Sequence, residues 1–320
     1  MKTYKWAIVG TGEIAQQLAM VFNHPNSELY AICSRNQETA ERFGEKYDIP
    51  VRYGSYDELL ADEAVDVVYV AVPNRFHKDY LLKALRGGKH VLCEKAITMD
   101  LAELEEVMAV AAEKNLILQE AMTIFNMPLF DHLRQLADSG KLGKLKMIQA
   151  PFGSYKEPDP TNRFFNPDLA GGALLDIGTY TVSLVRRFMN AQPQVTASQM
   201  LPFATGVDEQ SVTILENELG EMAAVTLTFQ AKMPKIGIIA YEKGYITIPE
   251  YPRAQAAEIF YTDGTRETIE VGETSQALNY EIANMVACIE GAPNNSLALT
   301  HDATALMDQM QHFWRAAKNS

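Results

Sequence analysis

The alternation of short apolar runs with amphipathic stretches over the first 120 residues restricts the fold of this chain more than any other feature. The stretches between the runs repeat apolar residues every three or four positions, as a helix with one buried face requires. Strands that alternate with helices pair in parallel through crossover helices, so the sequence predicts a doubly wound parallel sheet. The expected strands are 6–9, 28–33, 65–72, 90–93 and 116–118, and the expected helices are 14–22, 39–47, 56–60, 78–86 and 101–114.

The pattern changes after about residue 125. A loop rich in proline and glycine at 151–172 precedes one long helical pattern at 173–189. The following strands alternate apolar and polar residues and are separated by turns, which predicts a large, mostly antiparallel open sheet in an α+β domain. We therefore expect two domains, 1–121 and 122–320. The expected strands are 195–200, 210–215, 222–229, 236–241, 245–248, 257–261 and 267–271, followed by helices at 278–290 and 301–318.

The charge and composition of the chain exclude several classes of partner. A formal net charge of -13 disfavours nucleic acid and anionic membranes, since both require a basic surface. The first six residues resemble no signal segment, and no apolar run approaches the ~18 residues of a membrane span, so we expect a cytoplasmic protein. Cys33, Cys93 and Cys288 are too few and too far apart for a disulfide framework, and six histidines without ligand spacing indicate no metal site.

A glycine-containing turn, Gly10-Thr11-Gly12-Glu13-Ile14-Ala15, joins the first expected strand to the first helix. In a dinucleotide site the first glycine permits the tight turn, the second lets backbone approach the pyrophosphate, and the small sixth residue lets the helix lie close to the strand. An ordinary strand-to-helix turn is the alternative. Its place after the first strand of an alternating pattern favours a Rossmann domain that binds a nicotinamide dinucleotide.

The end of the second expected strand indicates which dinucleotide is bound. NAD sites usually carry an acidic residue there, about twenty positions beyond the turn, that accepts the ribose 2′-hydroxyl. This chain has Ser34-Arg35-Asn36 instead. Ser34 can donate a hydrogen bond and Arg35 can pair with a 2′-phosphate, so we expect NADP(H) to be preferred, with NAD(H) and a merely solvated Arg35 as alternatives.

Two further groups of residues carry reactive side chains. Lys95, directly after Glu94, stands at the carboxyl edge of the expected sheet, where open α/β folds bind ligands. Asp176 and Tyr180 are four residues apart, a spacing that places two side chains on one helix face. The structural alternatives are a solvated loop at Glu94-Lys95, and a capping acid with a core tyrosine.

Five segments together carry a resemblance that covers nearly the whole chain. They are Gly10-Thr11-Gly12-Glu13-Ile14-Ala15, Val72-Pro73-Asn74-Arg75-Phe76-His77, Glu94-Lys95, the stretch NPDLAGGALLDIGTY at 166–180, and Tyr280-Glu281-Ile282-Ala283. With these segments the chain resembles the glucose-fructose oxidoreductase and inositol dehydrogenase family, Gfo/Idh/MocA, and within it the dimeric dihydrodiol dehydrogenase branch.

The resemblance implies roles for specific residues. Lys95 corresponds to the lysine of the family's Glu-Lys-Pro motif, where Ala96 here replaces the proline, and Asp176 and Tyr180 correspond to the catalytic pair. Tyr180 stands where inositol dehydrogenases carry histidine, which points away from inositol as substrate. The cofactor-binding residues we expect are Gly10, Gly12, Glu13, Ile14, Ser34, Arg35, Asn36, Pro73, Asn74, His77, Glu94, Lys95 and Arg163. A purely structural His77 and a surface Arg163 are the alternatives.

These residue types suit hydride transfer to a carbonyl. The oxygen that gains negative charge must receive a proton from a group within hydrogen-bond reach. Free tyrosine has a pKa near ~10, and a nearby ammonium group favours the phenolate. We therefore expect Tyr180 to exchange the proton, Lys95 to supply the charge, and Asp176 to orient the lysine.

The expected function is an NADP(H)-dependent oxidoreductase that acts on a small sugar, polyol, diol or dicarbonyl. One alternative in the same family is a glycosidase or lyase that retains its nucleotide, and another is a non-catalytic NADP(H) sensor. An open sheet with one apolar face invites pairing across a two-fold axis, so we expect a homodimer or homotetramer.

Overall fold

The computed structural model describes residues 2–318, which divide into two compact units. The first unit contains the chain up to residue 122 together with 278–297, and the second contains 123–277 together with the chain from 298 onward. Residues 278–297, which the sequence-based division assigns to the second domain, thus pack with the N-terminal unit.

The first unit is built on a six-stranded parallel sheet. The strand order is β3-β2-β1-β4-β5-β6, which reverses direction between β1 and β4 as in the Rossmann fold. The prediction of a doubly wound parallel sheet is confirmed, although β3 is too short to show a period in the sequence and was not expected. The strands are β1 (Tyr4–Val9), β2 (Ser27–Cys33), β3 (Val51–Tyr53), β4 (Val67–Val70), β5 (His90–Glu94) and β6 (Leu118–Ala121).

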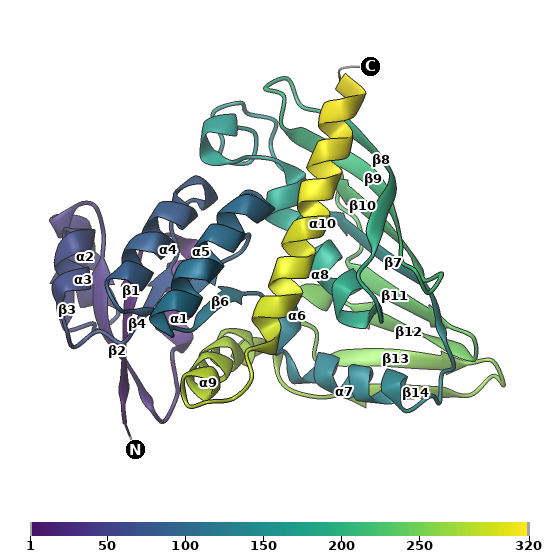
Figure 1. The fold of residues 1–320 in the computed structure, drawn as a ribbon, viewed down its shortest axis with the longest axis horizontal. Helices are drawn as coiled ribbons and strands as arrows, with labels where there is room; N and C mark the ends of the chain where they lie inside the picture. Colours follow the sequence, from purple (N-terminus) through teal and green to yellow (C-terminus); the bar gives the residue numbers. More distant parts are fainter. Residues whose placement is uncertain (1, 319–320) are drawn as a thin grey trace. The chain divides into compact units, whose positions relative to one another are not determined.

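Helices cover both faces of this sheet (Figure 1). Residues of α3, α4 and α5 form one apolar core with one face, and residues of α1, α2 and α9 form a second core with the other. Alternate strand residues therefore point into different cores, as Ile8 and Val9 do. The helices are α1 (Glu13–Val21), α2 (Gln37–Lys46), α3 (Tyr56–Ala61), the 3-10 helix η1 (Asn74–Phe76), α4 (His77–Arg86), α5 (Leu101–Lys114) and α9 (Ala277–Ile289).

The second unit is built on an eight-stranded sheet with the order β14-β13-β12-β11-β7-β10-β9-β8. All neighbours pair antiparallel except β7 and β10, so the expected mostly antiparallel sheet is confirmed. The central strand β7 was not expected. The strands are β7 (Leu145–Gly153), β8 (Gln194–Pro202), β9 (Asp208–Glu216), β10 (Met222–Thr228), β11 (Ile236–Tyr241), β12 (Gly244–Pro249), β13 (Ala256–Tyr261) and β14 (Arg266–Glu270).

One face of this sheet is buried and the other is exposed. Helix α8 contacts β7 and β10, whose inward residues Ile148 and Val225 are fully buried. Trp314 of α10 donates a hydrogen bond from Nε1 to Ser198 of β8 at 2.8 Å. The helices are α6 (Thr123–Asn126), α7 (Pro128–Asp138), η2 (Pro167–Leu169), the π-helical turn η3 (Leu174–Gly178), α8 (Thr179–Phe188), η4 (Tyr251–Arg253), η5 (Thr274–Gln276) and α10 (Asn295–Lys318).

The helix expected at 173–189 is not one regular helix. It begins with the π-helical turn η3 and becomes α-helical at Thr179. Gly178 stands at the junction in close contact with its surroundings: an added Cβ would meet a methyl carbon of Leu227 at 2.8 Å and one of Leu174 at 2.9 Å. Single π turns inside helices occur frequently at functional sites.

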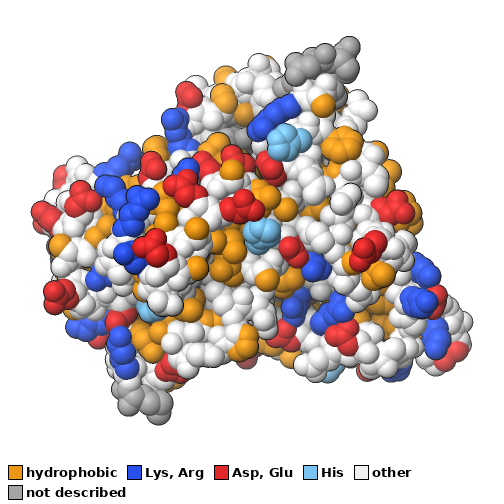
Figure 2. Space-filling view, viewed as in Figure 1, with side chains coloured by type: hydrophobic (Ala, Val, Ile, Leu, Met, Phe, Trp, Pro, Cys, Tyr) orange, Lys and Arg blue, Asp and Glu red, His pale blue; other side chains and the backbone are white. Residues whose placement is uncertain are grey.

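The surface carries mixed charges. Figure 2 shows acidic and basic side chains interspersed with hydrophobic ones over the visible face. Across residues 2–318, no helix combines the length and apolar character that crossing a membrane requires. Within the same range, no three His, Cys, Asp or Glu side chains gather closely enough to hold a metal ion. The three cysteines are buried and unpaired.

Candidate active site

The glycine turn lies at the carboxyl end of β1, beside the point where the strand order reverses. Gly10 has a φ of +109°, and a Cβ on it would stand 2.3 Å from the carbonyl oxygen of Ala71, directly after β4. Its amide donates to Cys33, the last residue of β2, at 3.0 Å. Only glycine fits this position, because both the backbone conformation and the space exclude a side chain.

Gly12 is the N-cap residue of α1 and provides no side-chain cap. A Cβ placed on Gly12 would meet nothing within 4 Å, so backbone at this position is open to close approach. The first amides of a helix lack intrahelical partners and attract anions. Ala15 is fully buried, which lets α1 lie close to the sheet. These residues fit the pyrophosphate of a dinucleotide.

Two further residues of this turn, Glu13 and Ile14, differ in their surroundings. Glu13 is exposed and accepts a hydrogen bond from Gln17 at 3.4 Å, one turn further along α1. Ile14 is half-buried and packs against the apolar core beneath α1.

Residues after β2 stand at the same edge of the sheet. Asn36 caps α2, since its side-chain oxygen accepts from the amide of Thr39 at 3.1 Å. The hydroxyl oxygen of Ser34 accepts from the Asn36 amide at 3.5 Å. Arg35 is exposed, and within residues 2–318 its side chain has no hydrogen-bond or ion-pair partner. The side-chain oxygen of Asn36 is therefore engaged in the helix cap, while the Arg35 guanidinium is available to a phosphate.

The loop after β4 contains Pro73 and Asn74, which begin η1, and leads to His77. His77 is fully buried, with Nε2 2.8 Å from the carbonyl oxygen of Val72 and Nδ1 3.0 Å from that of Ala96. Burial lowers the pKa of His77, opposed by these carbonyls, so the imidazole is neutral at neutral pH. His77 thus connects the loop after β4 to the loop after β5.

Lys95 follows β5, and buried carboxylates hold the backbone on either side of it. Glu94 accepts a hydrogen bond from the Tyr69 hydroxyl and another from the Lys95 amide at 3.3 Å. Glu120 of β6 accepts from the Ile97 amide at 3.0 Å. The expected strand at 116–118 stopped short of Glu120, so this contact was not predicted.

Asp176 and Tyr180 belong to the second unit. Asp176 lies in the π-helical turn and Tyr180 in the first turn of α8. The guanidinium of Arg163, in the preceding loop, lies 3.1 Å from the Asp176 carboxylate. The Tyr180 ring centroid is 5.9 Å from that of Phe152 on β7. The structure thus pairs Arg163 with Asp176, a contact that the sequence analysis did not anticipate.

Asp208, at the start of β9, is a residue that sequence reasoning missed. Its carboxylate accepts a hydrogen bond from the Leu174 amide at 2.6 Å. The two residues are 34 positions apart in the chain, so no local pattern links them.

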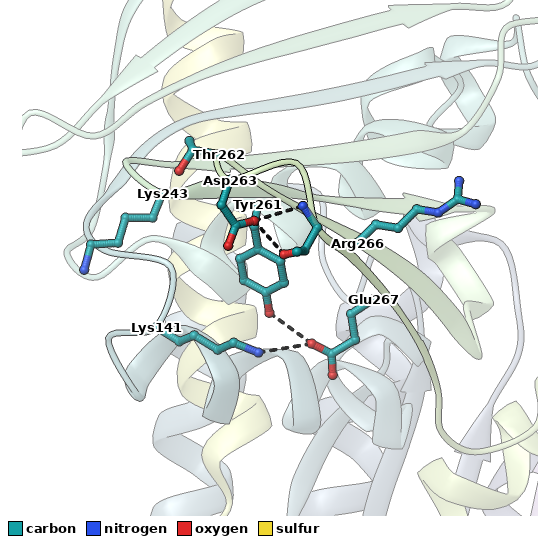
Figure 3. Close-up of a pocket in the computed structure, with 8 residues that line it drawn as sticks. Lys141, Lys243, Tyr261, Thr262, Asp263, Arg266 and Glu267 are labelled. Carbon is teal, nitrogen blue, oxygen red and sulfur yellow. Dashed lines mark hydrogen bonds and ion pairs between the residues drawn. The ribbon is translucent and has the colours of Figure 1, made fainter.

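A separate surface pocket of about 530 Å³ lies at the turn between β13 and β14 (Figure 3). Figure 3 shows Lys141 and Tyr261 pointing toward Glu267, with which they interact at 3.2 and 3.0 Å. None of the expected catalytic or cofactor-binding residues lines this pocket. Its location therefore does not bear on the chemistry of Lys95, Asp176 and Tyr180.

Comparisons with known proteins agree with this architecture. The profile of a family described as "Oxidoreductase family, NAD-binding Rossmann fold" matches residues 4–122, and that of the "GFO/IDH/MocA C-terminal domain" matches residues 130–267. The chain belongs to the Gfo/Idh/MocA family. It is an NAD(P)-dependent oxidoreductase.

Relatives within the family include dihydrodiol dehydrogenases. The trans-1,2-dihydrobenzene-1,2-diol dehydrogenase of Xenopus tropicalis is 31% identical over 95% of this chain and 96% of its own length. The enzyme of that name from Mus musculus is 33% identical over 76% of this chain and 74% of its own.

Solved structures share the fold. The 3-ketoreductase KijD10 from Actinomadura kijaniata, in complex with NADP and TDP-benzene, superposes with a TM-score of 0.86 at 24% identity, covering 97% of this chain and 98% of that one. A levoglucosan dehydrogenase in complex with NADH and levoglucosan gives a TM-score of 0.88 at 19% identity, covering 100% and 98%.

Proposed function

We propose that this Gfo/Idh/MocA enzyme transfers hydride between NADP(H) and a carbonyl or alcohol carbon of a small diol, sugar, polyol or dicarbonyl. The observation that carries the proposal is the ion pair of Arg163 with Asp176, an acid that stands four residues before Tyr180 in the stretch that carries the family resemblance. The dihydrodiol dehydrogenases among the relatives support a diol or related substrate.

The preference for NADP(H) rests on the residues after β2. Arg35 is exposed and has no side-chain partner within residues 2–318, and no acid stands between Ala31 and Asn36 to accept a ribose 2′-hydroxyl. A free guanidinium at this edge suits a 2′-phosphate through paired hydrogen bonds. Binding of NADP by KijD10 supports this choice, while the NADH complex of levoglucosan dehydrogenase keeps NAD(H) as the alternative.

The cofactor, when bound, supplies the hydride in reduction and accepts it in oxidation. The cradle for it is provided by Gly10 and Gly12 after β1, and Lys95 follows β5 at the same edge of the sheet. In reduction, Tyr180 gives its phenolic proton to the substrate oxygen as the carbonyl becomes an alcohol, and in oxidation it takes that proton back. We assign to Lys95 the role that the family motif implies, because an ammonium group favours the phenolate form of a tyrosine and stabilises negative charge on an oxygen.

Arg163 pairs with Asp176, a contact that was not expected from the sequence. Its guanidinium is largely exposed, whereas the Asp176 carboxylate that it contacts is mostly buried. Such a pair restricts the orientation of the Asp176 carboxylate.

Substitutions at Lys95 and Tyr180 test the proposal. Tyr180→Phe and Lys95→Met should each lower the hydride-transfer rate by roughly 100-fold or more while NADPH still binds. Tyr155→Phe and Lys232→Met, at exposed positions of the second unit, are the matched controls and should keep normal rates. Near-normal turnover in Tyr180→Phe or Lys95→Met contradicts the assignment.

A screen of sugars, polyols, diols and dicarbonyls, followed by NADPH absorbance, identifies the substrate class. An oxidoreductase changes the absorbance in proportion to substrate. Product formation without net nucleotide consumption favours the glycosidase or lyase alternative. Tight NADPH binding with no product from any compound favours a sensor, and either outcome overturns the proposed reaction.

The open sheet supports a homodimer. Its exposed face carries large apolar side chains on adjacent strands, and exposed apolar patches of this kind mark protein contacts. We propose that a second copy of the chain covers this face across a two-fold axis. The exposed apolar residues are Met147, Val212, Ile214, Met222, Ile236 and Tyr245.

A further inference from the structure

The start of the helical segment that carries Asp176 and Tyr180 is held by a side chain from another part of the second unit. The carboxylate of Asp208, the first residue of β9, accepts a hydrogen bond from the Leu174 amide at 2.6 Å. Leu174 is two residues before Asp176. Amides in the first turn of a helix have no intrahelical acceptor, so an acid that accepts from one of them fixes where the helix begins.

Gly172 makes room for this carboxylate. Its φ of +125° lies in the region that glycine tolerates, and a Cβ on it would stand 2.1 Å from Oδ1 of Asp208. A side chain at this position would therefore displace the acid from the helix start. Gly172, the second glycine of the pair before the helix, thus admits Asp208.

The same hairpin holds the loop that precedes the helix. The hydroxyl of Thr205, in the turn between β8 and β9, donates to the carbonyl oxygen of Phe165 at 2.6 Å. The rings of Phe165 and Phe203 lie 4.2 Å apart. This loop carries Arg163, the partner of Asp176. The β8–β9 hairpin therefore contacts both the loop that carries Arg163 and the helical turn that carries Asp176.

We propose that Asp208 is a positioning residue of the active site: by accepting from the Leu174 amide it fixes the helical turn from which Asp176 and Tyr180 project. This inference rests on the proposed function, because it assigns Asp208 a role only through the catalytic roles of those two residues. Asp208 itself is not proposed to touch substrate or cofactor.

The ionisation of Asp208 gives this contact a pH dependence. Burial raises the pKa of the carboxyl to about 7, opposed by hydrogen bonds from the amides of Leu174, Asp208 and Ala173. An ionised carboxylate only accepts hydrogen bonds, whereas a protonated one presents a donor to these amides. The neighbouring segments also carry Asp176 with its partner Arg163, Tyr180 on α8, Asp168 in the loop and Glu209 beside Asp208 on β9.

Two substitutions at Asp208 test the inference. Asp208→Ala removes the acceptor and should lower kcat roughly 10- to 100-fold, since small misplacements of catalytic groups have effects of this size. Asp208→Asn keeps the shape but replaces one acceptor oxygen with a donor, so it should behave like the protonated wild type. The KM for NADPH should stay unchanged in both, because the nucleotide cradle lies in the first unit.

The pH profile separates positioning from a merely structural role. The kcat of the wild type should fall as the pH drops through about 7 and approach the kcat of Asp208→Asn. The kcat of Asp208→Asn itself should not change over this pH range. Asp263→Asn is the matched control. Asp263 also accepts a hydrogen bond from a backbone amide at a turn, that of Thr265 at 2.9 Å. Its variant should have the kcat of the wild type and the same fall in kcat below about pH 7.

A double-mutant cycle with Gly172→Ala measures the contact directly. Gly172→Ala should lower kcat as Asp208→Ala does, and the double variant should lose less than the two single effects combined, because the added methyl then meets no carboxylate. An unchanged kcat in Asp208→Ala overturns the inference. So does a kcat of Asp208→Asn that falls below about pH 7 as the wild-type kcat does. If Tyr180→Phe retains activity, the proposed function fails instead, whatever the Asp208 variants do.

Discussion

The Nδ1 atom of His77 lies 3.0 Å from the carbonyl oxygen of Ala96, the residue next to Lys95. The other ring nitrogen faces the carbonyl oxygen of Val72 at 2.8 Å. A neutral imidazole donates from only one of its nitrogens, so it satisfies one of these carbonyls at a time. The placement of Lys95 thus depends on a buried histidine that is part of the loop after β4.

His77 should make stability depend on pH. Burial lowers its pKa below the ordinary value, so the unfolded chain binds the proton first, and the free energy of unfolding falls as the pH drops below about 6.5. His77→Gln should lack this component and should lower the free energy of unfolding by about 1–3 kcal/mol at neutral pH. Urea unfolding across pH measures both. The exposed His312→Gln is the control, and identical pH dependence in the two variants contradicts the prediction.

Gly10 and Gly12 should respond differently to alanine. Gly10→Ala places a methyl 2.3 Å from the Ala71 carbonyl oxygen at a φ of +109°, and should lower the free energy of unfolding by at least about 2 kcal/mol. Gly12→Ala meets open space at a φ of -68°, and should leave stability nearly unchanged while weakening NADPH binding. Urea unfolding and NADPH fluorescence titration distinguish the two effects. Equal loss of stability in both variants contradicts this account.

Arg35→Ala should change nucleotide selectivity. Loss of hydrogen bonds to a charged phosphate costs about 1.5–3 kcal/mol, so the KM for NADPH should rise by roughly 10- to 100-fold while that for NADH stays the same. Steady-state kinetics with both nucleotides measure the ratio. Arg42→Ala, an exposed arginine on α2 that pairs with Glu38, is the control. An equal change for NADPH and NADH in Arg35→Ala excludes a 2′-phosphate contact.

Ile214→Lys should disrupt the proposed dimer. Ile214 is 39% exposed on β9, opposite Ala224 of β10, and a charge there would be buried by a second copy of the sheet. Sedimentation of the variant should give a monomer where the wild type gives a dimer. Met20→Lys, at a 64% exposed position on α1, should remain dimeric. A dimeric Ile214→Lys places the contact elsewhere.

Much of the first unit could be predicted because its signals are local. The strands around Ile8 and Leu92 are short apolar runs between helical periods, and the turn at Gly10 has a backbone requirement that only glycine meets. Lys95, Asp176 and Tyr180 were predicted as catalytic residues from their positions in motifs. Their supporting contacts were not, since Glu120 and Arg163 reach their partners through folding rather than through spacing.

The sequence by itself therefore determined the parallel sheet, the dinucleotide turn and the family, because periodicity and glycine geometry act between residues close in the chain. Only the tertiary structure decided that β7 pairs in parallel with β10 in the middle of the second sheet, that residues 278–297 return to the first unit, and that Asp208 meets the amide of Leu174. These features depend on which distant segments pack together. That choice is made by burial and hydrogen bonding across the whole unit, which no local pattern records.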